Sequence, residues 1–148
     1  MVLFDWRDYM GKIVKSFAEL EKACQAKMMK AMSDTVDKSF QDLHTNVDHF
    51  YDSPGNPTSV ASPPPGYDRT GQLGESPEQE LSGGGNTAHG ELRLDTSYRY
   101  HPSGRDTNTI YSWAENGGLL GNGGFWEKTK DDVQKNIDDI FGREFTRK

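Results

Sequence analysis

The chain has 148 residues, with 17 basic and 23 acidic side chains and a formal net charge of -6. This length suits one domain and is too short for two ordinary ones, so we expect residues 1–148 to form a single domain. The acidic balance argues against a dedicated nucleic-acid binder, which needs a basic surface to displace counterions. Hydrophobic residues make up 32% of the chain, which predicts a thin core that a partner helps to complete.

The chain also lacks the sequence features of a membrane or secreted protein. No apolar run approaches the ~20 residues of a membrane-spanning helix, and the start of the chain lacks the basic and apolar regions of a signal peptide. The single cysteine, Cys24, excludes an intramolecular disulfide. We therefore expect a protein that is made in a cytoplasm and does not contact a membrane.

Apolar residues recur every three or four positions over residues 13–50, which is the period of one helix face. A continuous helix of ~35 residues would be about 50 Å long. Such a helix either breaks near residues 33–35 or projects and packs against a neighbour. Cys24 falls in the apolar stripe, where we expect it to be buried. Met29 falls beside the stripe, at a position that a neighbouring subunit could cover.

Residues 53–88 contain six of the seven prolines and the run Gly83-Gly84-Gly85. This composition predicts a long irregular loop within the domain. Two interpretations remain open: a surface linker, or an arm that becomes ordered on a partner.

Three shorter elements follow. Residues 91–100 alternate between apolar and polar side chains, which predicts a half-exposed strand. Residues 107–116 favour a helix that is capped by Asp106 or Thr107, stops at Gly117 and has Trp113 among its apolar members. After a flexible glycine-rich turn, Phe125 and Trp126 anchor an amphipathic helix that ends near residue 142. The predicted fold class is α+β, with a long N-terminal helical segment, a small antiparallel sheet, a C-terminal amphipathic helix and a long irregular loop.

The sequence contains no complete motif for catalysis or for ligand binding. The glycine-rich residues 117–124 lack the Gly-Lys-Ser/Thr of a phosphate-binding loop, because Phe125 and Trp126 stand in that place. His44 and His49 lack the spacing of a zinc motif. We expect no catalytic residue, no cofactor and no metal, and we predict that the protein is not an enzyme.

Several short motifs do resemble a known family. Residues 69–73 resemble the Arg-Thr-Gly-x-Leu signature of the tail-completion, or neck, proteins of long-tailed bacteriophages, which include the minor tail protein Z type. Residues 111–117 match a Tyr-x-x-x-Glu-x-Gly segment of that family, and residues 124–129 match the aromatic start of its last helix. Two departures are a longer, proline-rich stretch before Arg69 and Gly124 in place of the usual proline.

The resemblance implies a structural virion protein that forms a ring, completes the tail and joins it to the head. It implies self-association, as a hexamer or a dodecamer, and contacts with neighbouring neck, connector and tail proteins, with genomic DNA only as passing cargo. The protein would be assembled in the host cytoplasm and reside in the virion. The alternatives are a head-completion connector or adaptor, and a cytoplasmic protein-binding module. The candidate structural and interface residues are Arg69, Thr70, Gly71, Leu73, Met29, Trp113, Phe125 and Trp126.

Overall fold

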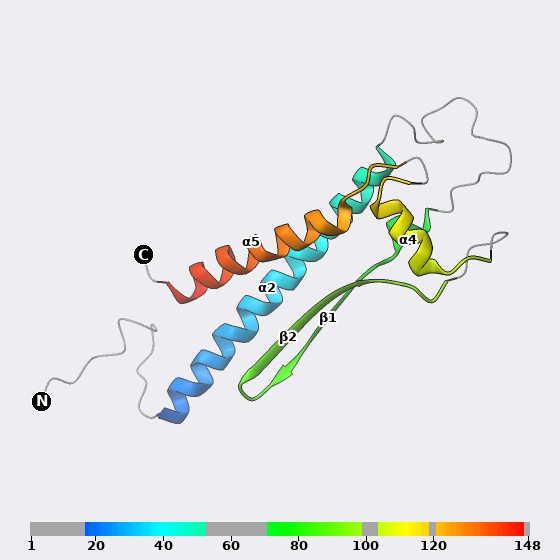
Figure 1. Cartoon of the computed structure of the whole chain (residues 1–148). Helices are drawn as coiled ribbons and strands as arrows, with labels where there is room; N and C mark the ends of the chain where they lie inside the picture. The colour runs from blue at the N-terminus through cyan, green and yellow to red at the C-terminus, as the bar shows by residue number, and fades with distance from the viewer. Residues whose placement is uncertain (1–16, 53–70, 99–103, 119–120, 147–148) are drawn as a thin grey trace, which may run out of the picture.

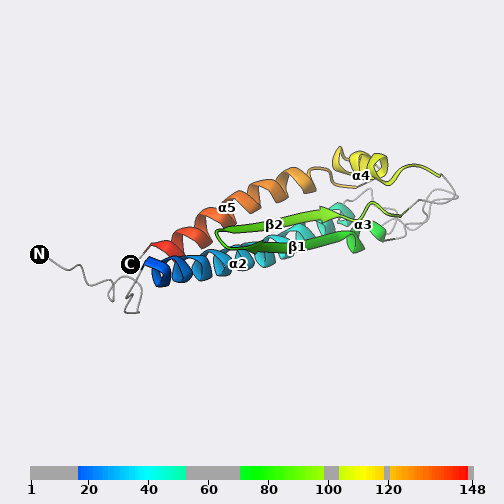
Figure 2. The ribbon, with the colours of Figure 1, turned by 90° about the horizontal axis from the view of Figure 1, so that it is seen from below.

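The computed structural model describes residues 17–52, 71–98, 104–118 and 121–146. These residues form an elongated α+β arrangement in which a long helix carries a second helix and a β-hairpin (Figures 1 and 2). The elements in chain order are α2 (Phe17–Tyr51), α3 (Gln72–Glu75), β1 (Pro77–Gly84), β2 (Thr87–Leu94), α4 (Thr107–Glu115) and α5 (Phe125–Phe145). The predicted fold class is confirmed. Within the described ranges, no helix is both long enough and apolar enough to cross a membrane.

Helix α2 runs unbroken for 35 residues, so of the two alternatives for this segment the break near residues 33–35 does not occur. The hydroxyl of Thr35 donates to the carbonyl of Ala31 at 2.7 Å, and this places a polar residue inside the helix without interrupting it. All the buried residues of α2 lie from Ala31 onward. The preceding turns are largely exposed, and Cys24 is exposed rather than buried, because no other described element covers its side of the helix there.

Helix α5 packs antiparallel along α2, as both ribbon views show (Figures 1 and 2). The predicted C-terminal amphipathic helix is confirmed, and it continues through residue 142 to Phe145. The predicted helix at 107–116 is also confirmed: the side chain of Asp106 caps α4 by accepting a hydrogen bond from the backbone N–H of Thr109 at 3.2 Å.

The hairpin corrects the expected loop at residues 53–88. Residues 71–88 form α3, all of β1, the turn and the start of β2, and β1 pairs antiparallel with β2 from Pro77 opposite Leu94 to Gly84 opposite Thr87. Pro77 is tolerated because it is the first residue of a strand. Gly83 and Gly84 end β1 and Gly85 lies in the turn, so residues typical of loops here delimit a hairpin. Residues 53–70 lie outside the described residues. The strand predicted at 91–100 begins earlier, at Thr87, and ends at Leu94.

The core gathers at one end of the molecule, where the C-terminal half of α2 meets α3, α4 and the start of α5 (Figure 1). We call this region the packed end. Its buried core residues are Leu43, Val47, Phe50, Leu73, Ile110, Tyr111, Ala114 and Phe125.

The opposite region, which we call the open end, comprises the first turns of α2 (residues 17–28), the hairpin tip (residues 84–87) and the last turn of α5 (residues 141–145). Few contacts join these parts. The side-chain amide of Gln25 donates to Asn86 at 2.6 Å, and Lys27 donates to the carbonyl of Glu144 at 3.4 Å. Large apolar side chains remain exposed here: Phe17 is 91% exposed and Phe145 is 42% exposed.

Candidate functional site

The residues of the first family motif that the structure describes lie at the packed end. Gly71 has a φ of 72°, in the left-handed region that favours glycine, and it begins α3. Leu73 is 5% exposed and belongs to the core. The backbone N–H of Gly74 donates to the hydroxyl of Tyr51 at 3.1 Å, which ties α3 to the end of α2. Gly71 thus forms a left-handed turn and Leu73 anchors the segment to the core, while Arg69 and Thr70 lie outside the described residues.

The second motif, at residues 111–117, joins three segments at the same end. The buried hydroxyl of Tyr111 donates to the carbonyl of Asp95 at 2.8 Å and accepts a bond from the side-chain amide of Gln72 at 3.4 Å. The carboxylate of Glu115 accepts from the backbone N–H groups of Trp126, at 2.8 Å, and Glu127, at 3.1 Å. This carboxylate therefore caps the N-terminus of α5 from another helix, where the helix dipole also favours a negative charge.

The departure at Gly124 fits this arrangement. Gly124 is the N-cap of α5 and offers no side-chain acceptor, so the first N–H groups of the helix are satisfied by Glu115 instead. The N–H of Gly124 itself donates to the backbone carbonyl of Glu115 at 2.8 Å. One residue of α4 thus fixes both the entry to α5 and its cap.

The glycine-rich turn before α5 is closely packed where it is described, and its flexibility stays a prediction. Asn122 donates its backbone N–H to the carbonyl of Phe50 at 3.2 Å and its side-chain amide to the carbonyl of His49 at 2.9 Å. These bonds satisfy carbonyls at the C-terminus of α2. A Cβ at Gly121 would lie 1.9 Å from the ring of Phe50, so only glycine fits there.

The aromatic candidates separate into buried and exposed positions. Phe125 is 4% exposed and belongs to the core, as predicted. Trp126 is half-buried: it packs against the core but also lines a groove, so it anchors the helix less fully than Phe125. Trp113 is 38% exposed, with the guanidinium of Arg105 4.6 Å from its ring centroid. It lies on the outer side of α4, although its spacing predicts an apolar face.

Met29 is half-buried. It lies four residues after Gln25 and three before Met32, and both of these contact the hairpin side of the molecule. Residues at these spacings share one side of a helix. Met29 therefore lies on the hairpin side of α2, and its role at an interface between subunits stays a prediction.

Two matching sets of polar residues join α2 and α5, and the apolar periodicity of the sequence does not reveal them. The side-chain amide of Asn46 donates to Thr129 Oγ1 at 3.1 Å and Asp132 Oδ2 at 2.9 Å. In the same way, the amide of Asn136 donates to Ser39 Oγ at 3.1 Å and Asp42 Oδ2 at 2.7 Å. Residues 38–46 and 128–136 share the pattern Lys-Ser/Thr-x-x-Asp-x-x-x-Asn. Because the helices are antiparallel, this repeated pattern places each asparagine against the other set.

The lysines complete the two sets. Lys38 lies 3.0 Å from Asp42, and Lys128 lies 2.8 Å from Asp132. The hydrogen bond from Asn46, followed by that from Lys128, lowers the pKa of Asp132. The hydrogen bond to Asp132 in turn raises the pKa of Lys128. The asparagine contacts fix the register of the helices, because a shift along the axis would leave the two buried amides unpaired.

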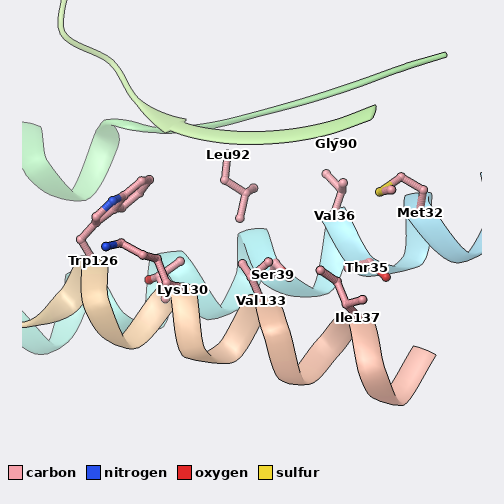
Figure 3. A pocket seen from close by; sticks show the side chains of 11 residues that line it. Met32, Thr35, Val36, Ser39, Gly90, Leu92, Trp126, Lys130, Val133 and Ile137 are labelled. Atoms are coloured by element: carbon pink, nitrogen blue, oxygen red, sulfur yellow. The ribbon is translucent and has the colours of Figure 1, made fainter. Parts of the chain in front are cut away.

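Beside this contact, α5 and the hairpin pack on adjoining sides of α2 and leave an apolar groove of about 350 Å³ between them (Figure 3). Helix α2 forms the floor, with Met32 and Val36 near its open-end side. Strand β2 forms one wall and α5 the other. The principal apolar wall residues are Leu92, Trp126, Val133 and Ile137.

The polar atoms of the groove are already engaged. Thr35 and Thr129 donate their hydroxyls to backbone carbonyls of their own helices, at 2.7 and 2.8 Å, and Ser39 Oγ accepts from Asn136. Lys130 is the charged member of the described lining, and it forms an ion pair with Glu127. The groove therefore suits apolar side chains better than a polar ligand.

The described residues contain no group of three or more histidine, cysteine, aspartate or glutamate side chains placed to hold a metal ion. On the outer face of the hairpin, Arg93 bonds to Glu78 at 2.7 Å and Glu80 at 3.1 Å, as in cross-strand pairs that stabilise a sheet. Compared with known families, curated proteins and solved structures, the chain shows no match.

Proposed function

We propose that this protein is a structural component of the neck of a long-tailed bacteriophage, where copies form a ring that completes the tail and joins it to the head. It would assemble in the host cytoplasm, contact neighbouring neck, connector and tail proteins, let genomic DNA pass, and catalyse no reaction. The proposal rests on the resemblance of residues 69–73, 111–117 and 124–129 to the tail-completion proteins.

One structural observation supports that proposal above the others. Described residues of all three motifs converge at the packed end, although they are far apart in the sequence. Leu73 and Tyr111 share one core, Gln72 bonds to Tyr111, and Glu115 caps the helix that Phe125 begins. Short motifs that match a family by chance have no reason to form one structural unit, whereas motifs that define a fold do.

The open end supports an assembled state. Phe17 is 91% exposed, and the first turns of α2 extend beyond the last turn of α5. Exposed apolar surface on a projecting helix is costly in an isolated subunit and is buried when copies associate. A closed ring repeats one such contact around an axis, so a single apolar residue contributes to every contact between neighbouring subunits.

The test is whether particles form without the protein. Electron micrographs of particles from a phage that lacks this gene should show DNA-filled heads and separate tails, and supplying the protein should restore joined, infectious particles. Normal joined particles would contradict the proposal and favour a cytoplasmic binding module. Heads that fail to retain DNA while tails are complete would favour a head-completion connector instead.

A matched pair of variants tests the role of the open end. Phe17→Asp should fold normally but fail to restore joined particles, because a charge replaces the exposed ring. Ala18→Asp is the control: it adds the same charge one residue along, on another side of the helix, at a position that is also exposed. Equal complementation by both variants would show that Phe17 is not at an interface.

A further inference from the structure

One wall of the groove is a row of partly exposed side chains that follow one another along α5 (Figure 3). Ile137 is 37% exposed, and Lys130 is exposed and forms an ion pair with Glu127 of its own helix. An ion pair between exposed side chains contributes little, so Lys130 can pair with another carboxylate at small cost. The members of the row are Trp126, Lys130, Val133 and Ile137.

The first turns of α2 carry a row with the same spacing. Phe17 is 91% exposed, Glu21 and Cys24 are also exposed, and Met28 is half-buried. Positions separated by four, three and four residues lie on one side of a helix. This row is therefore an apolar stripe with one carboxylate in it, and the described part of its own chain leaves it largely uncovered.

The two rows match position by position when the helices lie side by side and parallel. Both have steps of four, three and four residues, and the equal rise of two helices keeps each pair level over about 17 Å. In this alignment the carboxylate of Glu21 meets the ammonium of Lys130, so the one charged member of each row faces a charge of opposite sign. The other pairs are Phe17 with Trp126, Cys24 with Val133, and Met28 with Ile137.

The row on α2 cannot reach the groove of its own chain. Helix α2 is unbroken, and its Lys27 contacts the carbonyl of Glu144, whereas Val133 lies eleven residues before Glu144, or about 16 Å away along α5. We therefore infer that copies of this chain associate in solution, with residues 17–28 of one copy lying in the groove of a second copy, parallel to its α5. An amphipathic helix that lays its apolar face in a groove is a recurring mode of recognition. The inference rests on the proposed ring in one respect, because it names the contact that neighbouring copies would make there.

Disulfide trapping in the full-length protein tests this alignment, because the native Cys24 already lies opposite Val133. On oxidation, Val133→Cys should give covalent products of two or more chains. Lys135→Cys is the matched control: it lies two residues along α5, is exposed, and is outside the groove lining. Docking brings the two sulfurs to an effective concentration of about millimolar, so the cross-linked product should form at least about tenfold faster than in the control.

Two results would overturn the inference. Equal cross-linking rates for the two variants would mean that the first turns of α2 do not prefer the groove. A protein that stays monomeric in light scattering at every concentration reached would mean that copies do not associate in solution. Both results leave the proposed neck function standing, because that function is tested by the joining of heads and tails. Conversely, normal particles without the gene would refute the neck function and leave this contact in place.

A charge exchange tests the polar pair without introduced cysteines. Glu21→Lys and Lys130→Glu should each weaken self-association in light scattering by about two- to fivefold, the range that an exposed ion pair contributes. The double variant should regain the association of the unmodified protein, because the two charges are exchanged. Glu19→Lys is the matched control, since it makes the same charge reversal on the opposite side of the helix, where the residue is also exposed. A double variant that associates no better than the weaker single variant would show that the two side chains do not meet.

Discussion

The two ends of this molecule use the same long helix in opposite ways. At the packed end, Leu43 and Val47 of α2 are fully buried by α3, α4 and α5. At the open end, Phe17 and Cys24 continue the same apolar stripe but remain exposed. The helical period is equal in both halves, so the periodicity does not determine burial. Burial depends on which segments cover the helix, and the described segments leave the first turns of α2 largely uncovered.

This difference separates what holds the subunit together from what is available for association. Residues that stabilise the fold should be concentrated at the packed end and along the α2–α5 contact. Substitutions at the open end should leave folding almost unchanged and affect only docking or assembly. Measurements of unfolding free energy can therefore test the division position by position.

The largest effect is expected for the aromatic residue that begins α5. Phe125→Ala removes a ring that is 4% exposed and should lower the unfolding free energy by about 3–5 kcal/mol. Trp126→Ala should cost less, because Trp126 is half-buried at the groove. Phe17→Ala is the open-end control and should change stability by less than about 0.5 kcal/mol. Denaturant titration of the three variants measures these differences, and a cost at Phe17 close to that at Phe125 would refute the division.

Part of this division could be predicted from the sequence. The apolar period predicts α2 and α5, and the Asp106 cap predicts α4, because each depends on neighbours within a few residues. The hairpin could not be located in this way. Pro77 and the glycines near residue 84 are typical of loops, and they act as strand start and turn only because β2 supplies the pairing.

The candidate site shows the same limit. Glycine at position 71 predicts a left-handed turn, since that preference is local. The capping of α5 by Glu115 could not be predicted, because it joins residues of two helices through a tertiary contact. The asparagine sets are an intermediate case. Their repeated pattern is visible at 38–46 and 128–136, but its meaning requires the antiparallel arrangement of the helices.

The second largest loss of stability is expected when Asn46 or Asn136 is replaced. Asn46→Ala and Asn136→Ala should each lower the unfolding free energy by about 1–3 kcal/mol, because each removes the hydrogen bonds that join the two helices and leaves the carboxylate with only its lysine partner. The two costs should be similar, since the contacts match. Gln134→Ala is the control: it removes an exposed amide of α5 that bonds only within the helix to Asp138. A cost at Gln134 equal to the other two would show that the inter-helix bonds add no stability.

A smaller effect is expected at the cap of α5. Glu115→Ala removes the acceptor for two backbone N–H groups and should cost about 1–2 kcal/mol. Glu115→Gln should cost less, because an amide oxygen can still accept one of those bonds, although the charge at the helix N-terminus is lost. Glu127→Ala changes an exposed carboxylate in the same turn and serves as the control. If Glu115→Ala melts at the temperature of the unmodified protein, the cap has no energetic role.

The smallest effect is a pH dependence from Asp132. Its pKa in the folded protein lies below the ordinary value of 3.8, chiefly because Asn46 donates a hydrogen bond to the charged form and Lys128 adds another. The folded carboxyl therefore binds fewer protons than the unfolded one, so its contribution is present above the ordinary pKa and is lost as pH falls through the folded pKa. Asn46→Ala removes the main cause of this shift.

Unfolding free energies measured at about pH 6 and about pH 3 should thus fall by less in Asn46→Ala than in the unmodified protein. The difference should be small, because the side chain of Asp132 is 24% exposed and solvent screens its interactions. Other carboxyl groups titrate over the same range, and Asp95 also has a lowered pKa, from hydrogen bonds with Ser97. The titration of these other groups is common to both proteins and cancels in the comparison. The remaining difference is the pH-dependent part of the unfolding free energy that depends on Asn46. An equal fall in unfolding free energy in both proteins would mean that the acid sensitivity comes from other carboxyl groups. The bonds of Asn46 would then align α2 and α5 without depending on the charge of Asp132.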